Sequence, residues 1–376
     1  MKTLVLGGYG NFGACICRAL AGDPAVELMV GGRDDSRARA LADALGSGAR
    51  GIAIDWAASN FVEVLRRLGV ELLIHAAGPF QGQDYRVAQA AACVGAHYID
   101  LADGRRFVCD FPSALDADFR SAGRTAISGA STVPALSSAV VEQLARGWRS
   151  VHHISTCIAP AQTAPRGTAT LAAVLGYCGT EIQVWQKGRW QWRRAWSAPE
   201  RVQFARMPQR LGALCDIPDL ELFPAHFGVR DDVFFRAALE IGLAQRAFAA
   251  LAAARAAGVL KHPERLARPL NAMATWLDGL GSSRGGMVVR VAGEGSEGQA
   301  LRGEWHITAD NDHGPEIPCM ASILLARRLA RGEGLPLGAQ VCMGLLQLED
   351  FLPEFLHWGM QTDTLVEAAG HGAPAV

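Results

Sequence analysis

The feature that most constrains this chain is a glycine-rich turn near its N-terminus. A short apolar run, Thr3–Leu6, leads into Gly8, Gly10 and Gly13, and a helical pattern follows at once. In this spacing the first glycine permits a tight turn, the second lets a pyrophosphate approach the backbone, and the third lets the helix pack on the strand. The helix N-terminus then offers N–H groups and partial positive charge to phosphates. The alternative is a glycine-rich turn that binds nothing. The residues predicted to bind a dinucleotide here are Gly8, Tyr9, Gly10, Asn11, Phe12 and Gly13.

Apolar runs of four to six residues alternate with helical patterns as far as about residue 147. This alternation predicts an α/β fold, a doubly wound Rossmann sheet of parallel strands covered by helices on both faces. The expected strands are Thr3–Leu6, Glu27–Val30, Gly51–Ile54, Glu71–His75, His97–Leu101 and Thr125–Ser128.

The pattern changes after residue 147, where strands follow one another with few helices between them. We therefore expect a second α+β domain with a mixed or antiparallel sheet over 148–315, for substrate binding and dimerisation, and C-terminal helices over 316–376 that return to the Rossmann domain 1–147. The expected elements of the second domain are a strand at Val151–Ala159, a hairpin at Glu181–Trp196 that turns at Lys187-Gly188, a long helix at Asp231–Gly258, and strands at Met287–Gly293 and Ala300–Ala309.

The composition excludes several classes of partner. The chain has 36 basic and 37 acidic residues. It therefore lacks the excess of basic residues that would indicate a nucleic-acid partner. Its nine cysteines form no C-x-x-C pair, which is typical of reduced thiols in a cytoplasmic protein, and we expect no signal peptide. The apolar stretch 237–259 carries three charges and is a poor membrane span. A lipid-facing role for the aromatic hairpin is a further reading, against which core packing or a dimer sheet is favoured.

The end of the second expected strand points to NADP(H). An NAD site usually has an acidic residue there that accepts hydrogen bonds from the ribose, whereas this chain continues with Arg33. A guanidinium can bind a 2′-phosphate and stack on adenine. Asp34 and Asp35 complicate the prediction, because either could face the ribose, and Arg33 could also be a solvated surface residue. The residues predicted to form this part of the site are Gly32, Arg33, Ser36 and Arg37.

Small residues follow the fourth expected strand and predict close approach of the cofactor to the backbone. His75 precedes them and could be an acid or base, but a core histidine fits its apolar surroundings better. Asp55, after the third strand, could bind the adenine amino group or be an unpaired surface carboxylate. The cofactor residues predicted at these two strand ends are Asp55, Ala76, Ala77, Gly78, Pro79 and Phe80.

Two acids lie at the end of the fifth expected strand. Asp100 and Asp103 should both point toward a substrate near the carboxyl end of the sheet. Asp103 is the better candidate for proton transfer, because it should lie beyond the strand. The alternative is a structural ion pair of Asp103 with Arg105 or Arg106.

Two further segments carry candidate substrate contacts. Ser131 and Thr132 follow the sixth expected strand, where they could bind a substrate carboxylate or cap a helix that begins near Pro134. The segment 309–316 contains three acids and His313. Its spacing matches no metal site, so we predict no metal, only a turn in which His313 could face the substrate.

Several of these motifs together resemble the saccharopine dehydrogenase (saccharopine reductase-like) oxidoreductases. The motifs are GGYGNFG, GGR, HAAGPF, GAHYIDLADGR, SGASTVPALSSAVV and DNDHGPEIP. The resemblance implies a Rossmann domain, an inserted domain with a mixed sheet, NADP-linked chemistry and a homodimer.

The sequence therefore predicts an NADP(H)-dependent oxidoreductase. Hydride would move between the nicotinamide and a C=N, C=O or activated C=C carbon of a small metabolite in the cleft between the domains, with Asp103 handling a proton. The alternative is a non-catalytic NADP-binding sensor or partner-docking protein.

Overall fold

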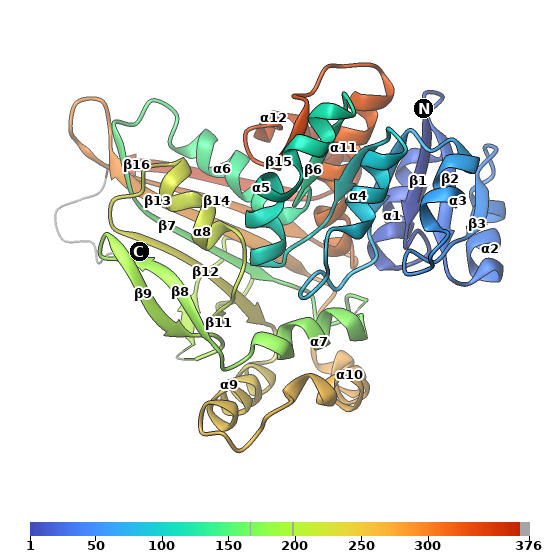
Figure 1. The fold of residues 1–376 in the computed structure, drawn as a ribbon. Coiled ribbons are helices and arrows are strands. Elements are labelled where there is room, and N and C mark those ends of the chain that lie inside the picture. Colours follow the sequence, from blue (N-terminus) through green and yellow to red (C-terminus); the bar gives the residue numbers. More distant parts are fainter. Residues whose placement is uncertain (166, 198, 369–376) are drawn as a thin grey trace. The chain divides into compact units, whose positions relative to one another are not determined.

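The computed structural model describes residues 1–165, 167–197 and 199–368 (Figure 1). The chain divides into two compact units. The first contains Met1–Leu136 and Pro315–Leu346, and the second contains Ser137–Gly314 and the segment that begins at Gln347. One unit has a parallel sheet and the other a mixed sheet, so the predicted fold class is confirmed.

The first unit is built on a seven-stranded parallel sheet with the order β15-β6-β5-β4-β1-β2-β3. Its strands are β1 Lys2–Leu6, β2 Glu27–Gly32, β3 Arg50–Ala53, β4 Leu72–His75, β5 His97–Asp100, β6 Thr125–Ser128 and β15 Gly338–Val341. Its helical segments are α1 Asn11–Leu20, α2 Asp35–Leu45, α3 Phe61–Leu68, α4 Arg86–Cys93, α5 Arg105–Ser121, η1 Thr132–Leu136, η4 Gly314–Glu316 (which begins at the last residue of the second unit) and α11 Ile317–Ala330. All six expected strands are present; five of them carry the buried apolar residues at the centre of this sheet, and β3 is its edge strand.

The second unit is built on a nine-stranded sheet in which β12 runs parallel to β7 and the other pairs are antiparallel. Its strands are β7 Ser150–Ala159, β8 Glu181–Gln186, β9 Arg189–Arg194, β10 Glu200–Val202, β11 Arg210–Leu214, β12 Asp232–Leu239, β13 Gly285–Glu294, β14 Ala300–Ala309 and β16 Gln361–Ala368. Its helical segments are α6 Ser137–Leu144, α7 Thr168–Tyr177, α8 Asp219–His226, α9 Gly242–Ala256, η2 Pro263–Leu266, α10 Ala267–Trp276, η3 Asp278–Leu280 and α12 Leu348–His357. Helix α6 packs against β13 and β14, and α8 packs against β12 (Figure 1).

The expected hairpin is present as β8 and β9. Its two-residue turn has Lys187 at φ 55° and Gly188 at φ 67°, and two positive φ values are what a tight hairpin turn of this kind requires. The indole rings of Trp185 and Trp190 pack edge to face across the strands, with their centroids 5.3 Å apart.

The prediction of one long helix over Asp231–Gly258 is wrong. The first part is β12, which pairs with β7 in parallel and β11 in antiparallel register, and only Gly242–Ala256 is helical. Val233 and Phe235 are buried in the sheet. A short apolar run fits a helix or a buried strand equally well by pattern, so pairing with β7 decides the outcome.

The C-terminal segment divides between the two units, which differs from the expected return of all of 316–376 to the Rossmann domain. α11 and β15 lie in the first unit, where β15 extends the parallel sheet beside β6. α12 and β16 lie in the second unit, where β16 pairs with β14 along its whole length. The described chain ends at residue 368.

Two features are absent from the described residues. None of the helices there has the length and hydropathy that a bilayer crossing requires. No group of three or more His, Cys, Asp or Glu side chains in the same part of the chain is arranged to hold a metal ion.

Candidate dinucleotide site

The glycine-rich turn joins β1 to α1 and is fixed by its own backbone. The N–H groups of Gly7 and Gly8 both donate to the Gly31 carbonyl oxygen at 2.9 Å, which ties the turn to β2. A Cβ on Gly13 would lie 2.1 Å from the Gly7 carbonyl oxygen. Only glycine at 13 therefore lets the helix come this close to the end of the strand.

The N-terminus of α1 is left open by its sequence. Gly10 is the N-cap residue and supplies no side-chain cap, and no acidic residue lies in the first turn. The helix dipole and the first-turn N–H groups are therefore available to an anion. This arrangement fits the pyrophosphate of a dinucleotide and would supply neutralising hydrogen bonds without a charged side chain.

The two carboxylates after β2 are held by α2. Asp34 caps this helix, accepting hydrogen bonds from the Arg37 N–H at 3.1 Å and the Ser36 hydroxyl at 2.6 Å, and these bonds lower the Asp34 pKa, the Ser36 bond most. Asp35 forms an ion pair with Arg39 at 2.9 Å. Both carboxylates thus have local structural roles.

One of the two arginines that follow β2 contacts the side chain of Tyr9. The Arg37 guanidinium lies over the Tyr9 ring, 4.5 Å from its centroid. Arg33 is exposed and has no hydrogen bond or ion pair to any other described residue. The loop after β2 and the first turn of α2 therefore carry two exposed arginines on either side of Asp34, whose N–H binds the Tyr9 hydroxyl.

The loop after β4 is fixed by a glutamine that sequence reasoning missed. The Gln83 side-chain amide donates to the carbonyl oxygens of Ala77 at 3.0 Å and Pro79 at 2.7 Å. The Phe80 ring is buried. Ala76 continues the sheet by donating its N–H to Leu6 O. The predicted loop residues Ala76, Ala77, Gly78, Pro79 and Phe80 therefore follow β4 at the carboxyl end of the sheet.

His75 is a core histidine. It is 1% exposed, its Nδ1 lies 3.1 Å from the Tyr98 hydroxyl, and its ring packs against Phe80 with centroids 5.0 Å apart. Burial lowers the pKa of His75 to about 4. The ring is therefore neutral at physiological pH, as a core histidine is expected to be.

Asp100 joins the ends of β5 and β6. Its buried Oδ1 accepts hydrogen bonds from Ala102 N at 2.9 Å, Gly129 N at 2.9 Å and the Ser128 hydroxyl at 3.0 Å. Burial raises the pKa of Asp100 to about 6, while these hydrogen bonds act to lower it. Asp100 therefore positions the two loops that carry Asp103 and the 131–132 pair.

Asp103 lies beyond β5, as expected. Its carboxylate is exposed and accepts a hydrogen bond from the Gln81 side-chain amide at 3.1 Å. The protein around the carboxyl group removes part of its hydration and raises its pKa. Of the two arginines named as alternative partners, Arg106 forms an ion pair with Asp110 at 3.2 Å.

The remaining candidates have varied surroundings. Asp55 is exposed and accepts a hydrogen bond from Ala57 N at 3.0 Å in the turn after β3. Ser131 and Thr132 are buried after β6. The expected cap at this position is altered, because a single π-turn, Thr132–Leu136, precedes the regular helix α6.

Asp310, Asp312 and His313 of the late acidic segment lie in the second unit, whereas Glu316 lies in the first. Asp310 pairs with Arg284 at 2.5 Å, and Asp312 accepts a hydrogen bond from the Thr163 hydroxyl at 2.5 Å. The His313 ring lies against Trp358, with centroids 4.9 Å apart. The acids thus form a turn, and His313 is half-buried beside an aromatic ring.

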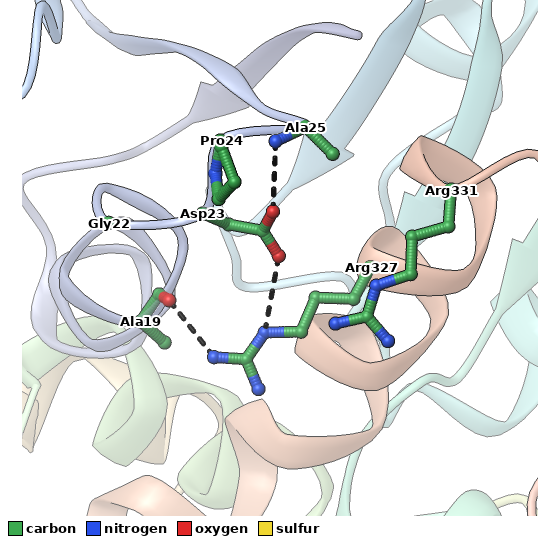
Figure 2. A pocket seen from close by; sticks show the side chains of 7 residues that line it. All are labelled: Ala19, Gly22, Asp23, Pro24, Ala25, Arg327 and Arg331. Atoms are coloured by element: carbon green, nitrogen blue, oxygen red, sulfur yellow. Dashed lines mark hydrogen bonds and ion pairs between the residues drawn. The ribbon is translucent and has the colours of Figure 1, made fainter.

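A shallow cavity of about 530 Å³ lies elsewhere in the first unit, between the C-terminal end of α1 and α11 (Figure 2). Arg327 of α11 donates to the Ala19 carbonyl oxygen at 3.0 Å and lies 3.9 Å from the Asp23 carboxylate. At the other end of α1, the Cys319 thiol donates to the Phe12 carbonyl oxygen at 3.4 Å. Helix α11 therefore holds the glycine-turn helix at both of its ends.

Most predicted site residues meet at one place. The glycine-rich turn and the loops after β2, β3, β4, β5 and β6 all follow the carboxyl ends of parallel strands in one sheet. In open sheets of this kind ligands bind at that edge. The fold and the open helix N-terminus together define a dinucleotide-binding Rossmann domain.

A comparison with protein families gives a match for most of this domain. Residues 3–127, a third of the chain, match the family model described as the saccharopine dehydrogenase NADP binding domain. The resemblance that the motifs indicated is confirmed. No curated protein matches in sequence.

Solved structures match over nearly the full chain. The apo saccharopine dehydrogenase (L-Glu forming) from Saccharomyces cerevisiae has a TM-score of 0.70 and 11% identity, covering 98% of this chain and 100% of that one. The homospermidine synthase from Legionella pneumophila, in complex with NAD, has a TM-score of 0.60 and 10% identity, covering 99% and 94%. At these identities the matches establish a shared two-unit fold.

Proposed function

We propose that the chain is an NADP(H)-dependent oxidoreductase that transfers a hydride to or from a C=N, C=O or activated C=C carbon of a small metabolite. The observation that carries the choice of NADP(H) is the loop after β2. Its two carboxylates, Asp34 and Asp35, cap α2 and pair with Arg39, whereas Arg33 and Arg37 remain on the surface beside the glycine-rich turn. A 2′-phosphate would bind two guanidinium groups there, while a ribose hydroxyl would find no free carboxylate.

The open end of α1 supports the same proposal for the rest of the cofactor. Its N–H groups would bind the pyrophosphate, and the small residues Ala76–Gly78 would leave room for the nicotinamide half. The cofactor supplies the hydride chemistry when bound. The chain would position it and supply or accept a proton, for which Asp103 is the proposed group because it is exposed at the same edge of the sheet.

Titration of the purified protein with NADPH and NADH, followed by nicotinamide fluorescence, tests the cofactor preference. We expect tighter binding of NADPH. Arg33→Gln should weaken NADPH binding by about tenfold or more and leave NADH binding unchanged, because a charge-assisted hydrogen bond contributes roughly 1.5–3 kcal/mol.

Arg39→Gln is a matched control for that experiment. It removes one positive charge from helix α2, six residues further along the chain, but this arginine is already paired with Asp35. We expect its NADPH affinity to equal that of the wild type. Equal binding of NADH and NADPH by the wild type would refute the proposed cofactor preference.

A turnover assay separates an enzyme from a nucleotide-binding sensor. NADPH oxidation is followed with panels of aldehydes, 2-oxo acids and 2-oxo acids mixed with amino acids, and NADP reduction with the corresponding products. We expect at least one panel to be turned over and Asp103→Asn to lower that rate by two orders of magnitude or more. Binding of NADPH with no turnover in any panel would favour the sensor.

A further inference from the structure

Tyr9 connects the glycine-rich turn to the loop after β2. Its hydroxyl accepts a hydrogen bond from Asp34 N at 3.0 Å. Its ring lies close to the backbone of Gly32, since a Cβ there would be 2.3 Å from the ring carbon Cε1 of Tyr9. The Arg37 guanidinium lies over the ring, 4.5 Å from the centroid. Three residues from the end of β2, the following loop and the first turn of α2 are therefore arranged around one phenol ring.

The hydroxyl of Tyr9 keeps an unused donor. A phenol both accepts and donates, and its acceptor position is filled by the Asp34 N–H. Among the described residues none accepts a hydrogen bond from the Tyr9 hydroxyl. The side chain is half-exposed, so this donor faces solvent or a ligand.

The charged groups near that donor favour an anionic ligand. Arg37 lies against the ring and Arg33 is exposed on the same loop, while the Asp34 carboxylate is occupied by Ser36 and by the Arg37 N–H. One neutral O–H donor next to two guanidinium groups is a suitable site for a phosphate monoester.

We propose that the Tyr9 hydroxyl donates a hydrogen bond to the adenosine 2′-phosphate and so determines the preference for NADP(H) over NAD(H). This inference rests on the proposed function. It adds a specificity residue that lies in the glycine-rich turn itself, outside the loop after β2 where such residues are usually sought.

The test is Tyr9→Phe, which keeps the ring, its contact with Gly32 and the Arg37 contact, and removes only the hydroxyl. Dissociation constants are measured by calorimetry for NADPH and NADH, and for the fragments 2′,5′-ADP and 5′-AMP. We expect Tyr9→Phe to weaken NADPH and 2′,5′-ADP by about tenfold, the effect of one hydrogen bond to a charged group, and to leave NADH and 5′-AMP unchanged.

Two further variants keep the result interpretable. Tyr85→Phe is the matched control, because that hydroxyl donates to the Phe107 carbonyl oxygen on α5, and its affinity for all four ligands should equal the wild type. Gly32→Ala would displace the Tyr9 ring, and should also reduce the preference for the phosphorylated ligands.

The possible failures are distinguishable. If the wild type prefers NADPH and Tyr9→Phe retains the full preference, the role of the hydroxyl is refuted and the proposed function stands. If Tyr9→Phe weakens all four ligands equally, Tyr9 only shapes the loop and the inference is again refuted. If the wild type shows no preference for NADPH, both the inference and the proposed cofactor are refuted.

Discussion

Asp100 provides a quantitative test of the electrostatics at the carboxyl edge of the parallel sheet. Its pKa is raised by burial from 3.8 to about 6. Between these values the folded protein keeps a proton that the unfolded chain has released, so the free energy of unfolding falls as pH rises. Each unit of pKa shift corresponds to 1.36 kcal/mol, so two units make the ionised Asp100 cost about 3 kcal/mol at about pH 8.

The perturbation is Asp100→Asn, which keeps an oxygen that can accept the bonds from Gly129 and Ser128 and removes the charge. Urea unfolding of wild type and variant is measured at about pH 5 and about pH 8. We expect the stability of the variant relative to wild type to rise by roughly 1–2 kcal/mol between the two, because about half of the cost is already present at the lower pH. Other groups that titrate in this range cancel, since both proteins contain them.

Asp118→Asn is the control for that measurement. It removes an exposed carboxylate from α5, where solvent screens the charge, and its difference from the wild type should be the same at both pH values. The reasoning is refuted if Asp100→Asn also differs from the wild type by the same amount at both, since the buried carboxyl would then titrate like one in water.

Three other variants test contacts elsewhere in the chain. Gly13→Ala should abolish NADPH binding, because the new Cβ would lie 2.1 Å from the Gly7 carbonyl oxygen, and normal binding by a folded variant in a fluorescence titration would contradict this. Burial raises the pKa of Asp219 to about 7, so Asp219→Asn should stabilise the protein by about 4 kcal/mol at about pH 8 and by less at about pH 5 in urea unfolding; a pH-independent gain would argue against it. Arg327→Met should lower the free energy of unfolding by about 1 kcal/mol, because the hydrogen bond to Ala19 O is lost, and an unchanged thermal melt would show that the contact is dispensable.

The local pattern of the sequence was enough to predict the cofactor half of the fold. The run from Thr3 to Gly13 has the strand, the turn and the helix start in one short segment, and each depends on its own residues. The same is true of the hairpin turn at Lys187-Gly188, where two adjacent residues adopt positive φ. Patterns that are complete within a few residues can be interpreted without knowing what packs against them.

Long-range pairing decided what the sequence left open. The segment Asp232–Leu239 is a strand because it pairs with β7 on one side and β11 on the other. The segment Gln361–Ala368 lies in the second unit because it pairs with β14. The role of Tyr9 likewise depended on its partners, since its hydroxyl binds the N–H of Asp34, which is 25 residues further along the chain. The sequence by itself determined which residues could bind a dinucleotide. Only the tertiary structure decided that the Tyr9 hydroxyl lies beside the loop after β2 and that the Asp100 carboxyl is occupied by groups that follow β6, because the supply of free donors and acceptors depends on every neighbour that the fold brings near.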